Sequence, residues 1–262
     1  MLGALAALGL SCAGQLMQGG AAVCQTAPGA AVLLDGEIAL TADAKGRFVI
    51  GFDRDAAPTA SVRVSLGGEE AQALYAIAPR TWRLQRVDGL PQQTVTPTRP
   101  EVLEKIKADA ALKQAAFASQ AEGEGFAQAW RWPLRAARVS GSFGSARVLN
   151  GAPGQPHYGV DLAAAEGNTV SAPAEGVVTL AETGMHYEGG LVFIDHGQGF
   201  TSMYLHLSEV AVRSGQRLGP GERIGAVGST GRATGPHLCW RLKWRGRNLD
   251  PSLLPAEALL SP

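Results

Sequence analysis

The segment of residues 233–242, ATGPHLCWRL, ends in six residues in which apolar side chains alternate with the others. This alternation predicts a β-strand. Successive side chains of a β-strand point to opposite faces, so His237, Cys239 and Arg241 share one face. The residues between them are apolar and form a core-facing side. A strand with one apolar face belongs in a sheet that covers a core. On the other face, His237 and Cys239 leave three interpretations open: metal ligands, a thiol nucleophile with its base, or an ordinary buried thiol.

The composition favours a mostly β protein. The 262 residues include 34 Gly and 15 Pro, which supply many turns. Lys and Arg together number 23, and so do Asp and Glu. This balance gives no reason to expect nucleic acid or an acidic polymer as a partner.

Three regions follow one another after residue 27. Residues 30–95 predict a small N-terminal β domain, with hairpin turns at Asp35-Gly36 and Lys45-Gly46. Residues 98–128 predict a helical connector with a modest apolar stripe. Residues 130–255 return to strands and Gly-rich loops. The expected fold class is therefore mostly β, with the helix joining the small β domain to a second β-rich domain.

Residues 1–27 are interpreted as a signal peptide or a disordered tail. The apolar run at residues 2–10 is followed by small residues, as in a secretory signal, and is too short to span a bilayer. No other segment is apolar enough to cross a membrane, so we expect an exported protein without a transmembrane helix. A disulfide between Cys24 and Cys239 is not favoured, because the two are far apart in sequence.

All five histidines lie in the second half of the chain. His157 and Asp161 are four residues apart, and histidine with a carboxylate is a common pair of zinc ligands. His206 ends a predicted strand, with Tyr204 on the same face by strand alternation. His186 and His196 are interpreted as ordinary loop and turn residues.

Several segments, in order and spacing, resemble the lysostaphin/LytM-type zinc metalloendopeptidases, which cut peptide cross-links or stem peptides of bacterial peptidoglycan. The resemblance covers roughly residues 130–255. It is carried by the following segments: HYGVDLAA, APAEGVVTLA, GGLVFIDHGQGFTSMYLHLSEV, GQRLGPGERIGAVGSTGRATGPHL and DPSLL.

The resemblance implies a zinc site on the floor of a groove in an antiparallel sheet. Two zinc ligands fall on His157 and Asp161, and the catalytic histidines fall on His206 and His237. The third ligand position, a histidine in the family, is Cys239 here. Cysteine sulfur is a good zinc ligand, so we expect Cys239 to bind as a thiolate.

The expected substrate is a peptidoglycan peptide, and three further residues are candidates for binding it. Tyr204 is a candidate hydrogen-bond donor. Arg147 and Arg241 are candidates for contacts to stem-peptide carboxylates, with solvated surface arginines as the alternative interpretation. The glycines of residues 225–235 are expected to let the groove wall approach an extended peptide.

Two other functions remain open. In the first, a degenerate domain binds cell wall or regulates a separate amidase without hydrolysis. In the second, Cys239 is the nucleophile of a thiol enzyme, which requires a base within hydrogen-bond reach. The retained His157, Asp161, His206 and His237 favour the zinc enzyme, located in the periplasm or cell envelope.

Overall fold

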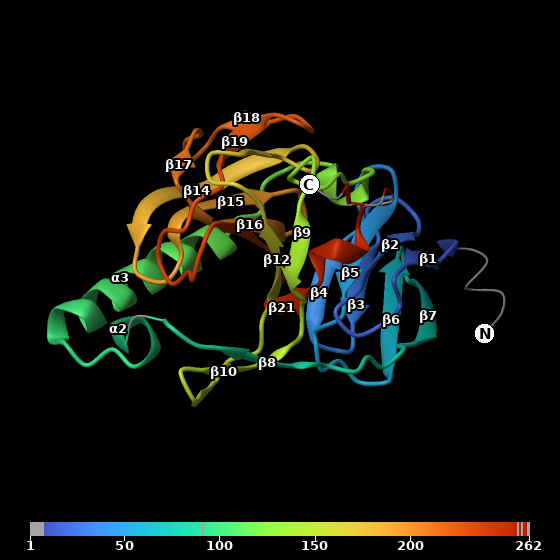
Figure 1. Cartoon of the computed structure of the whole chain (residues 1–262). Helices are drawn as coiled ribbons and strands as arrows, with labels where there is room; N and C mark the ends of the chain where they lie inside the picture. The colour runs from blue at the N-terminus through green and yellow to red at the C-terminus, as the bar shows by residue number, and fades with distance from the viewer. Residues whose placement is uncertain (1–7, 91, 256, 258, 261–262) are drawn as a thin grey trace. The chain divides into compact units, whose positions relative to one another are not determined.

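The computed structural model describes residues 8–90, 92–255, 257 and 259–260. The chain divides into two compact units, traced from blue to red in Figure 1. Unit 1 contains the described residues up to Thr81 together with Trp244–Leu249. Unit 2 contains Trp82–Lys243 and the described residues from Asp250 onward. The mostly β fold class is confirmed.

Unit 1 is built from antiparallel sheets. One has the strand order β1-β2-β5 and another the order β4-β3-β6-β7. Its strands are β1 (Ser11–Gly14), β2 (Ala21–Gln25), β3 (Ala31–Leu34), β4 (Ile38–Thr41), β5 (Arg47–Gly51), β6 (Thr59–Leu66), β7 (Glu69–Ala76) and β21 (Arg247–Leu249).

Polar contacts join the C-terminal segment of unit 1, Trp244–Leu249, to the N-terminal part of the same unit. The guanidinium of Arg247 lies 2.9 Å from the Asp35 carboxylate and donates to the Gly51 carbonyl. The Asn248 amide donates to the Asp53 carboxylate at 2.9 Å. Unit 1 is therefore assembled from two stretches of chain that are far apart in sequence.

The prediction of a disordered tail at residues 1–27 is wrong for the strands within it. β1 pairs with β2, and β2 pairs along its whole length with β5. Cys12 and Cys24 face each other in this ladder and form a disulfide. Alternating apolar side chains of β2, including the buried Ala22 and Cys24, give this segment a place in a core. The apolar run of the predicted signal lies largely outside the described residues, so the leader itself stays a prediction.

Unit 2 is organised around a sheet with the strand order β18-β14-β15-β16-β20-β12-β9. Its elements are β8 (Leu84–Val87), α2 (Gln92–Val95), α3 (Pro100–Phe117), η1 (Gly125–Ala127), β9 (Arg138–Gly141), β10 (Ala146–Leu149), β11 (Ala152–Gly154), β12 (Gly159–Ala163), β13 (Thr169–Ser171), β14 (Gly176–Met185), β15 (Gly189–Asp195), β16 (Phe200–Leu207), β17 (Glu209–Val210), β18 (Arg217–Leu218), β19 (Arg223–Ala226), β20 (His237–Trp244) and η2 (Pro251–Leu253).

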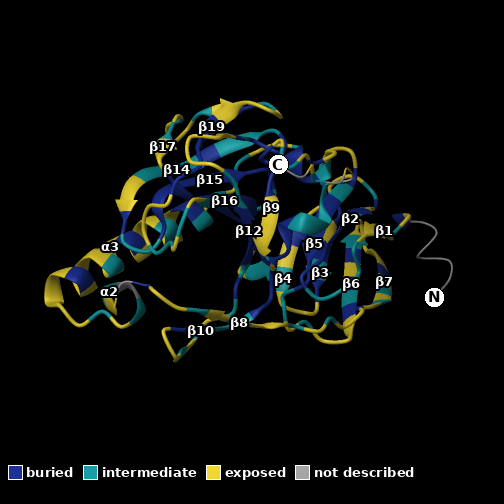
Figure 2. Ribbon diagram, viewed as in Figure 1, coloured by how far each residue is buried: buried dark blue, intermediate teal, exposed yellow. Residues whose placement is uncertain are grey.

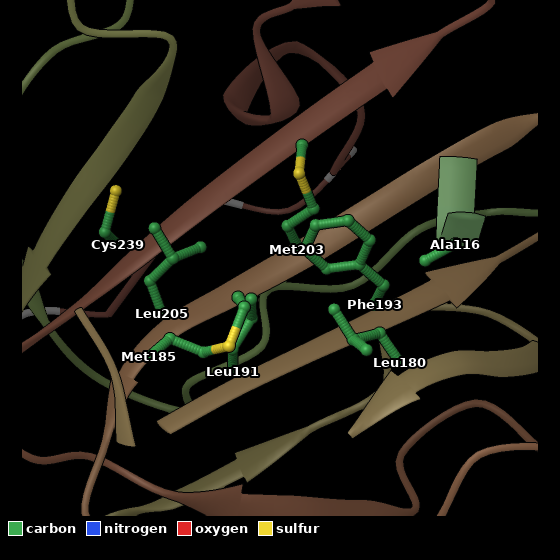
Figure 3. Close-up of a cluster of buried hydrophobic side chains, with 8 residues drawn as sticks. All are labelled: Ala116, Leu180, Met185, Leu191, Phe193, Met203, Leu205 and Cys239. Carbon is green, nitrogen blue, oxygen red and sulfur yellow. The ribbon is translucent and has the colours of Figure 1, made fainter. Parts of the chain in front are cut away.

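Both faces of the central strands are covered, as the dark blue of β15 and β16 shows in Figure 2. On one face, α3 packs through Ala116 and Phe117 against a cluster that includes Phe193 and Cys239. Figure 3 shows this cluster, with Leu205 next to Cys239 at one end. On the other face, the ring of Trp130 stacks on Trp240 at 6.3 Å. Each large apolar side chain buried in this way contributes about 1.5–3 kcal/mol.

The boundaries of the predicted regions shift in the structure. Of the predicted 30–95 domain, the part from Trp82 belongs to unit 2, where β8 pairs in parallel with β10. The predicted helical connector at 98–128 contains α3, which ends at Phe117, and the short turn η1. Of the helices in the described residues, none has the length and apolarity needed to cross a membrane.

His196 joins a polar chain inside the core of unit 2. Its Nδ1–H donates to the Glu175 carbonyl at 2.7 Å, and its Nε2 lies 2.7 Å from the Ser202 hydroxyl. The Ser202 hydroxyl is in turn 2.8 Å from the Tyr204 hydroxyl. Burial lowers the pKa of His196 from 6.5 to about 4, because the charged form is poorly solvated. The histidine interpreted from sequence as a turn residue is thus a buried, neutral part of the core.

We expect His196 to make the stability of the protein depend on pH. A histidine whose pKa is lowered by folding stabilises the native state fully above its unfolded pKa of 6.5. That contribution is lost as the pH falls toward the folded value of about 4, and amounts to about 3 kcal/mol. Denaturant unfolding between pH 7 and 4 should therefore show a shallower pH dependence for His196→Asn than for the native chain. His186→Asn, at a half-buried loop position, is the control, and an unchanged slope in His196→Asn would contradict this account.

The disulfide gives a second prediction. Protein unfolded without reductant should titrate as one free thiol, from Cys239, and as three after reduction. Cys12 and Cys24 are 12 residues apart, so their link should stabilise unit 1 by about 3 kcal/mol through the lost entropy of the unfolded chain. The double variant Cys12→Ala/Cys24→Ala should unfold at lower temperature, with no further response to reductant. A native melting temperature that ignores reductant would argue against this contribution.

Candidate functional site

The pairing of β12 with β20 brings the predicted metal ligands together. The two strands run antiparallel, with Asp161 opposite Cys239 and Ala163 opposite His237. Directly opposed residues project to the same face of a sheet, so the carboxylate and the thiol meet across the ladder. His157 comes just before β12, four residues ahead of Asp161. Three residues from two separate segments thus converge on one point.

The ligand atoms of His157, Asp161 and Cys239 all lie within 4.8 Å of one another. His157 Nε2 is 3.0 Å from Asp161 Oδ1 and 3.4 Å from Cys239 Sγ. Around a four-coordinate zinc with bonds of about 2.0–2.3 Å, ligand atoms are spaced roughly 3.3–3.7 Å apart. All three residues are buried. The donor set and its spacing therefore fit a zinc ion, and within the described part of the chain no other group of three such residues meets the same test.

Two arginines donate hydrogen bonds to two of the candidate metal ligands, Asp161 and Cys239. Arg147 Nη2 donates to Asp161 Oδ2 at 2.7 Å and Arg147 Nε to Gln85 at 3.1 Å. Arg241 Nε donates to Cys239 Sγ at 3.4 Å. Burial opposes ionisation of Asp161, but His157 and Arg147 outweigh it and lower the pKa of the carboxyl well below its usual range. The Asp161 carboxyl is therefore held in its ionised form, which suits a metal cation.

The absence of a side chain at Gly141 leaves room for the Asp161 carboxylate. This residue lies opposite Asp161 on β9, and a Cβ built there would come within 2.4 Å of Asp161 Oδ2. A side chain at this position would displace the carboxylate from both His157 and Arg147.

His206 reaches the same face through a β-bulge. The β15–β16 ladder pairs Gly190 with Leu207 but Leu191 with Leu205, which leaves His206 as the extra residue. Its φ of 69° is in the left-handed region, which non-glycine residues seldom adopt. The bulge interrupts strand alternation, so His206 turns away from the side of Tyr204 and lies 4.7 Å, ring to ring, from His237.

In both histidines, Nδ1 is hydrogen-bonded to a backbone carbonyl. His206 Nδ1–H donates to the Thr230 carbonyl and His237 Nδ1–H to the Gly235 carbonyl, each at 2.8 Å. In the neutral ring this leaves Nε2 as a proton acceptor. Burial lowers the pKa of His206 to about 4 and also lowers the pKa of His237, so both rings are neutral at neutral pH. His237 Nε2 is 3.9 Å from Asp161 Oδ1, beside the candidate metal site.

The two histidines and Asp161 line a pocket of about 310 Å³. One wall is the segment of β8 and the residues after it, together with β10. Another part of the lining comes from the loop before β20. The lining residues are Gln85, Val87, Leu90, Ser140, Arg147, Leu149, Asp161, Ala163, His206, Arg232, Ala233, Thr234, Gly235, Pro236 and His237.

Tyr204 is a correction to the sequence analysis. It was expected beside His206 as a substrate contact, but its side chain is fully buried and its hydroxyl contacts Ser202 in the core. The bulge at His206 is the cause, because it ends the alternation from which the shared face was inferred. Arg147 does line the pocket, but its guanidinium is held by Asp161. Arg241 is half-buried against Cys239 and does not line the pocket.

The glycines of residues 225–235 serve the protein's own packing. A Cβ at Gly228 would meet the Ser208 amide at 2.4 Å, and one at Gly231 would meet the Gly189 amide at 2.5 Å. Only Gly235 combines open space with a position in the pocket wall. The expectation that this run lets the wall approach a substrate therefore rests on that one residue.

Sequence reasoning missed the part of the pocket lining that comes from β8 and the residues after it. Gln85, Val87 and Leu90 lie about 120 residues before His206 and had been assigned to the N-terminal domain. It also missed Arg232, on the loop before β20. A signal for Arg232 was present in the sequence, since it is a cation five residues before His237 in a Gly-rich segment.

Part of the chain matches a known protein family. The family described as peptidase family M23 matches residues 155–251. The chain is 45% identical over 95 residues to the peptidoglycan DD-endopeptidase ShyA of Vibrio cholerae, a match covering 36% of this chain and 22% of ShyA. It is 30% identical over 123 residues to the murein hydrolase activator NlpD of Salmonella dublin, covering 47% of this chain and 30% of NlpD. The chain thus spans less than a third of the length of either relative.

One solved structure is similar over nearly the whole chain. It is a peptidase M23 structure from Pseudomonas aeruginosa, 26% identical, with a TM-score of 0.66. The match covers 92% of this chain and 94% of that chain. The similarity therefore extends over elements of both units.

We expect the metal content of variants to report which residues are ligands. Cys239→Ser should lose zinc, because a serine hydroxyl is a much poorer ligand than a thiolate. Cys239→His should keep it, since imidazole is also a good zinc ligand. The measurement is zinc per chain after dialysis against a weak chelator, with melting curves to confirm folding. Full zinc occupancy in Cys239→Ser would remove Cys239 from the ligand set.

Proposed function

Residues 155–251 form a peptidase family M23 domain, and on this basis we propose that the chain is a zinc-dependent metalloendopeptidase that hydrolyses peptide bonds in the cross-links or stem peptides of bacterial peptidoglycan. The observation that carries the proposal is the pocket in which His206 and His237 present their Nε2 atoms beside the group of His157, Asp161 and Cys239. The ShyA relative, named a peptidoglycan DD-endopeptidase, supports the substrate class.

In this proposal His157, Asp161 and Cys239 hold the zinc ion. Zinc bound by three protein ligands supplies Lewis-acid activation of the scissile carbonyl and of the attacking water. Arg147 and Arg241 keep the carboxylate and the sulfur in place, as groups behind metal ligands commonly do. Cysteine is an acceptable ligand here because its sulfur is already 3.4 Å from His157 Nε2.

We assign different roles in proton transfer to His206 and His237. His206, with a pKa lowered to about 4, is neutral at physiological pH and can accept a proton from the attacking water at Nε2. His237 lies closer to Asp161, whose charge counteracts part of the effect of burial on its pKa. We therefore assign to His237 the stabilisation of the oxyanion of the tetrahedral intermediate. Because Nε2 is an acceptor in the neutral ring, it would donate to the oxyanion after taking up a proton, which the nearby charge of Asp161 favours. The hydrogen bonds from Nδ1 to backbone carbonyls fix both ring orientations.

The runner-up is a domain that activates another murein hydrolase without cutting peptides itself. The relationship to NlpD, named a murein hydrolase activator, supports this alternative. Against it stands the retention of a complete donor group and two oriented histidines, which an activator does not need. The thiol-enzyme alternative is weaker still. Cys239 does have a base within reach, in His157 at 3.4 Å, but the thiol is 1% exposed and does not line the pocket.

We further propose that the protein is exported and works at the cell envelope. The disulfide of Cys12 and Cys24 supports this location, because such bonds persist in oxidising compartments. Peptidoglycan lies in the same compartment, so the location and the proposed substrate agree.

The proposal is tested by digesting purified peptidoglycan with the zinc-loaded chain and separating the released muropeptides. The native chain should convert cross-linked muropeptides into uncross-linked products, or shorten the stem peptides. His206→Ala and His237→Ala should each lower the rate by about 10²–10⁴-fold, the usual contribution of a general acid or base, while keeping their zinc. His186→Ala, in a loop outside the pocket, is the matched control. Native chain that leaves the muropeptides unchanged but accelerates an added amidase would favour the activator instead.

A further inference from the structure

The neutral His206 ring can accept a proton at Nε2 only if its own proton is on Nδ1. The partner of Nδ1 is the Thr230 carbonyl, at 2.8 Å. A carbonyl oxygen can only accept a hydrogen bond, so this contact assigns the ring proton to Nδ1 and leaves Nε2 as the acceptor. The tautomer and orientation of His206 therefore depend on where the backbone of Thr230 lies.

The side chain of Thr230 ties its own backbone to the two strands beside His206. Thr230 lies in the loop of residues 227–236, between β19 and β20, and belongs to no strand ladder. Its hydroxyl accepts a hydrogen bond from the Gly190 amide and donates one to the Leu207 carbonyl, each at 2.9 Å. Gly190 and Leu207 are the paired residues next to the bulge at His206. One hydroxyl thus joins the loop to both β15 and β16 at that bulge.

The start of β15 is shaped to receive this hydroxyl. Gly189 has a φ of 68°, and a Cβ built there would overlap the Thr230 hydroxyl, so the close approach requires a glycine. The bulged backbone of His206 is held by the same segment, because its amide donates to the Glu188 carbonyl at 2.8 Å. Residues 188–190 therefore fix the backbone of His206 on one side and the side chain of Thr230 on the other.

The two histidines of the pocket differ in how their rings are held. His237 Nδ1 bonds to the Gly235 carbonyl, two residues earlier in the chain, so its orientation follows from the local backbone. His206 Nδ1 bonds to a carbonyl 24 residues further along the chain. Such a contact persists only while the loop that carries it is held in place, and the Thr230 hydroxyl supplies a direct tie.

We propose that Thr230 is the positioning residue of His206: its hydroxyl holds the Thr230 carbonyl against the ring and so keeps Nε2 as the acceptor in the pocket. The catalytic consequence rests on the proposed function, because a ring with its proton on Nε2 cannot take a proton there from the attacking water. Thr230 is not among the residues that line the pocket, so it acts through His206 and not on the substrate.

The test is the tautomer of His206, read by NMR at neutral pH from the nitrogen shifts and proton couplings of isotope-labelled histidine in the full chain. His206→Ala and His237→Ala identify the two signals. In the native chain the His206 proton should be on Nδ1. Thr230→Val keeps the size of the side chain but removes both hydroxyl hydrogen bonds. In this variant the His206 proton should be shared between the two ring nitrogens, while His237 keeps its native pattern.

The conservative variant separates the hydroxyl from the rest of the side chain. Thr230→Ser keeps the hydroxyl and should retain the native tautomer of His206. With a soluble cross-linked muropeptide as substrate, kcat should fall about tenfold in Thr230→Val, with KM little changed, and should recover in Thr230→Ser. Ser208→Ala is the matched control, since the Ser208 hydroxyl donates to the Val227 carbonyl, at 2.8 Å, instead.

Three results would overturn the proposal. The first is a native chain with the His206 proton on Nε2. The second is a native tautomer in Thr230→Val with folding confirmed by melting curves, or in Thr230→Ala, which removes the same two hydrogen bonds, if Thr230→Val does not fold. The third is an equal loss of the native tautomer in Ser208→Ala, which would indicate a general loosening of the sheet.

The tautomer is measured without turnover, so its outcome is distinguishable from that of the proposed function. A shifted tautomer in Thr230→Val, with no cleavage by the native chain, would reject the enzyme and keep the positioning role of Thr230. Cleavage by the native chain, with the tautomer of His206 unchanged in Thr230→Val, would keep the enzyme and reject that role.

Discussion

The antiparallel pairing of β12 with β20 is the interaction on which the site depends. Its register places Asp161 opposite Cys239 and Ala163 opposite His237, so one ladder sets the position of two candidate metal ligands and one histidine. A slip of one residue would send the carboxylate and the thiol to opposite faces of the sheet. The apolar residues of β20 between those polar ones, buried against Trp130 and its neighbours, make that slip costly. The same strand register is therefore required by the packing of the core and by the geometry of the site.

Strand alternation in the sequence was sufficient where the strands are regular. It placed His237, Cys239 and Arg241 on one face of β20, and the structure has Arg241 donating to Cys239 on that face. The spacing of His157 and Asp161 suggested a pair, the family resemblance supported it, and the two side chains lie 3.0 Å apart in the structure. Their meeting with Cys239 was inferred from the family resemblance, because the register between two strands 80 residues apart cannot be read from either strand alone.

Alternation failed at His206, where one bulged residue reverses the side to which the chain points. Tyr204 was assigned to the pocket for that reason and lies in the core. The pocket wall formed by β8 was missed because parallel pairing of β8 with β10 depends on contacts between distant segments. The N-terminal strands were missed for a similar reason, since a short Ala- and Gly-rich segment becomes a strand only through its partner β5 and the disulfide.

The division of the chain into units also bears on the order in which its parts can fold as the chain emerges, N-terminus first. Unit 1 needs Trp244–Leu249, so its assembly cannot finish before residue 249 is available to it. Unit 2, whose sheet closes with β20 at Trp244, is complete in most of its strands slightly earlier. The N-terminal strands must therefore wait, as a partly formed sheet, for a partner made more than 160 residues later. Contacts of such long sequence separation slow folding and leave strand edges open in the meantime. The disulfide between Cys12 and Cys24 closes a short loop early. It then keeps β1 and β2 in register until Arg247 and Asn248 form their hydrogen bonds with Asp35 and Asp53.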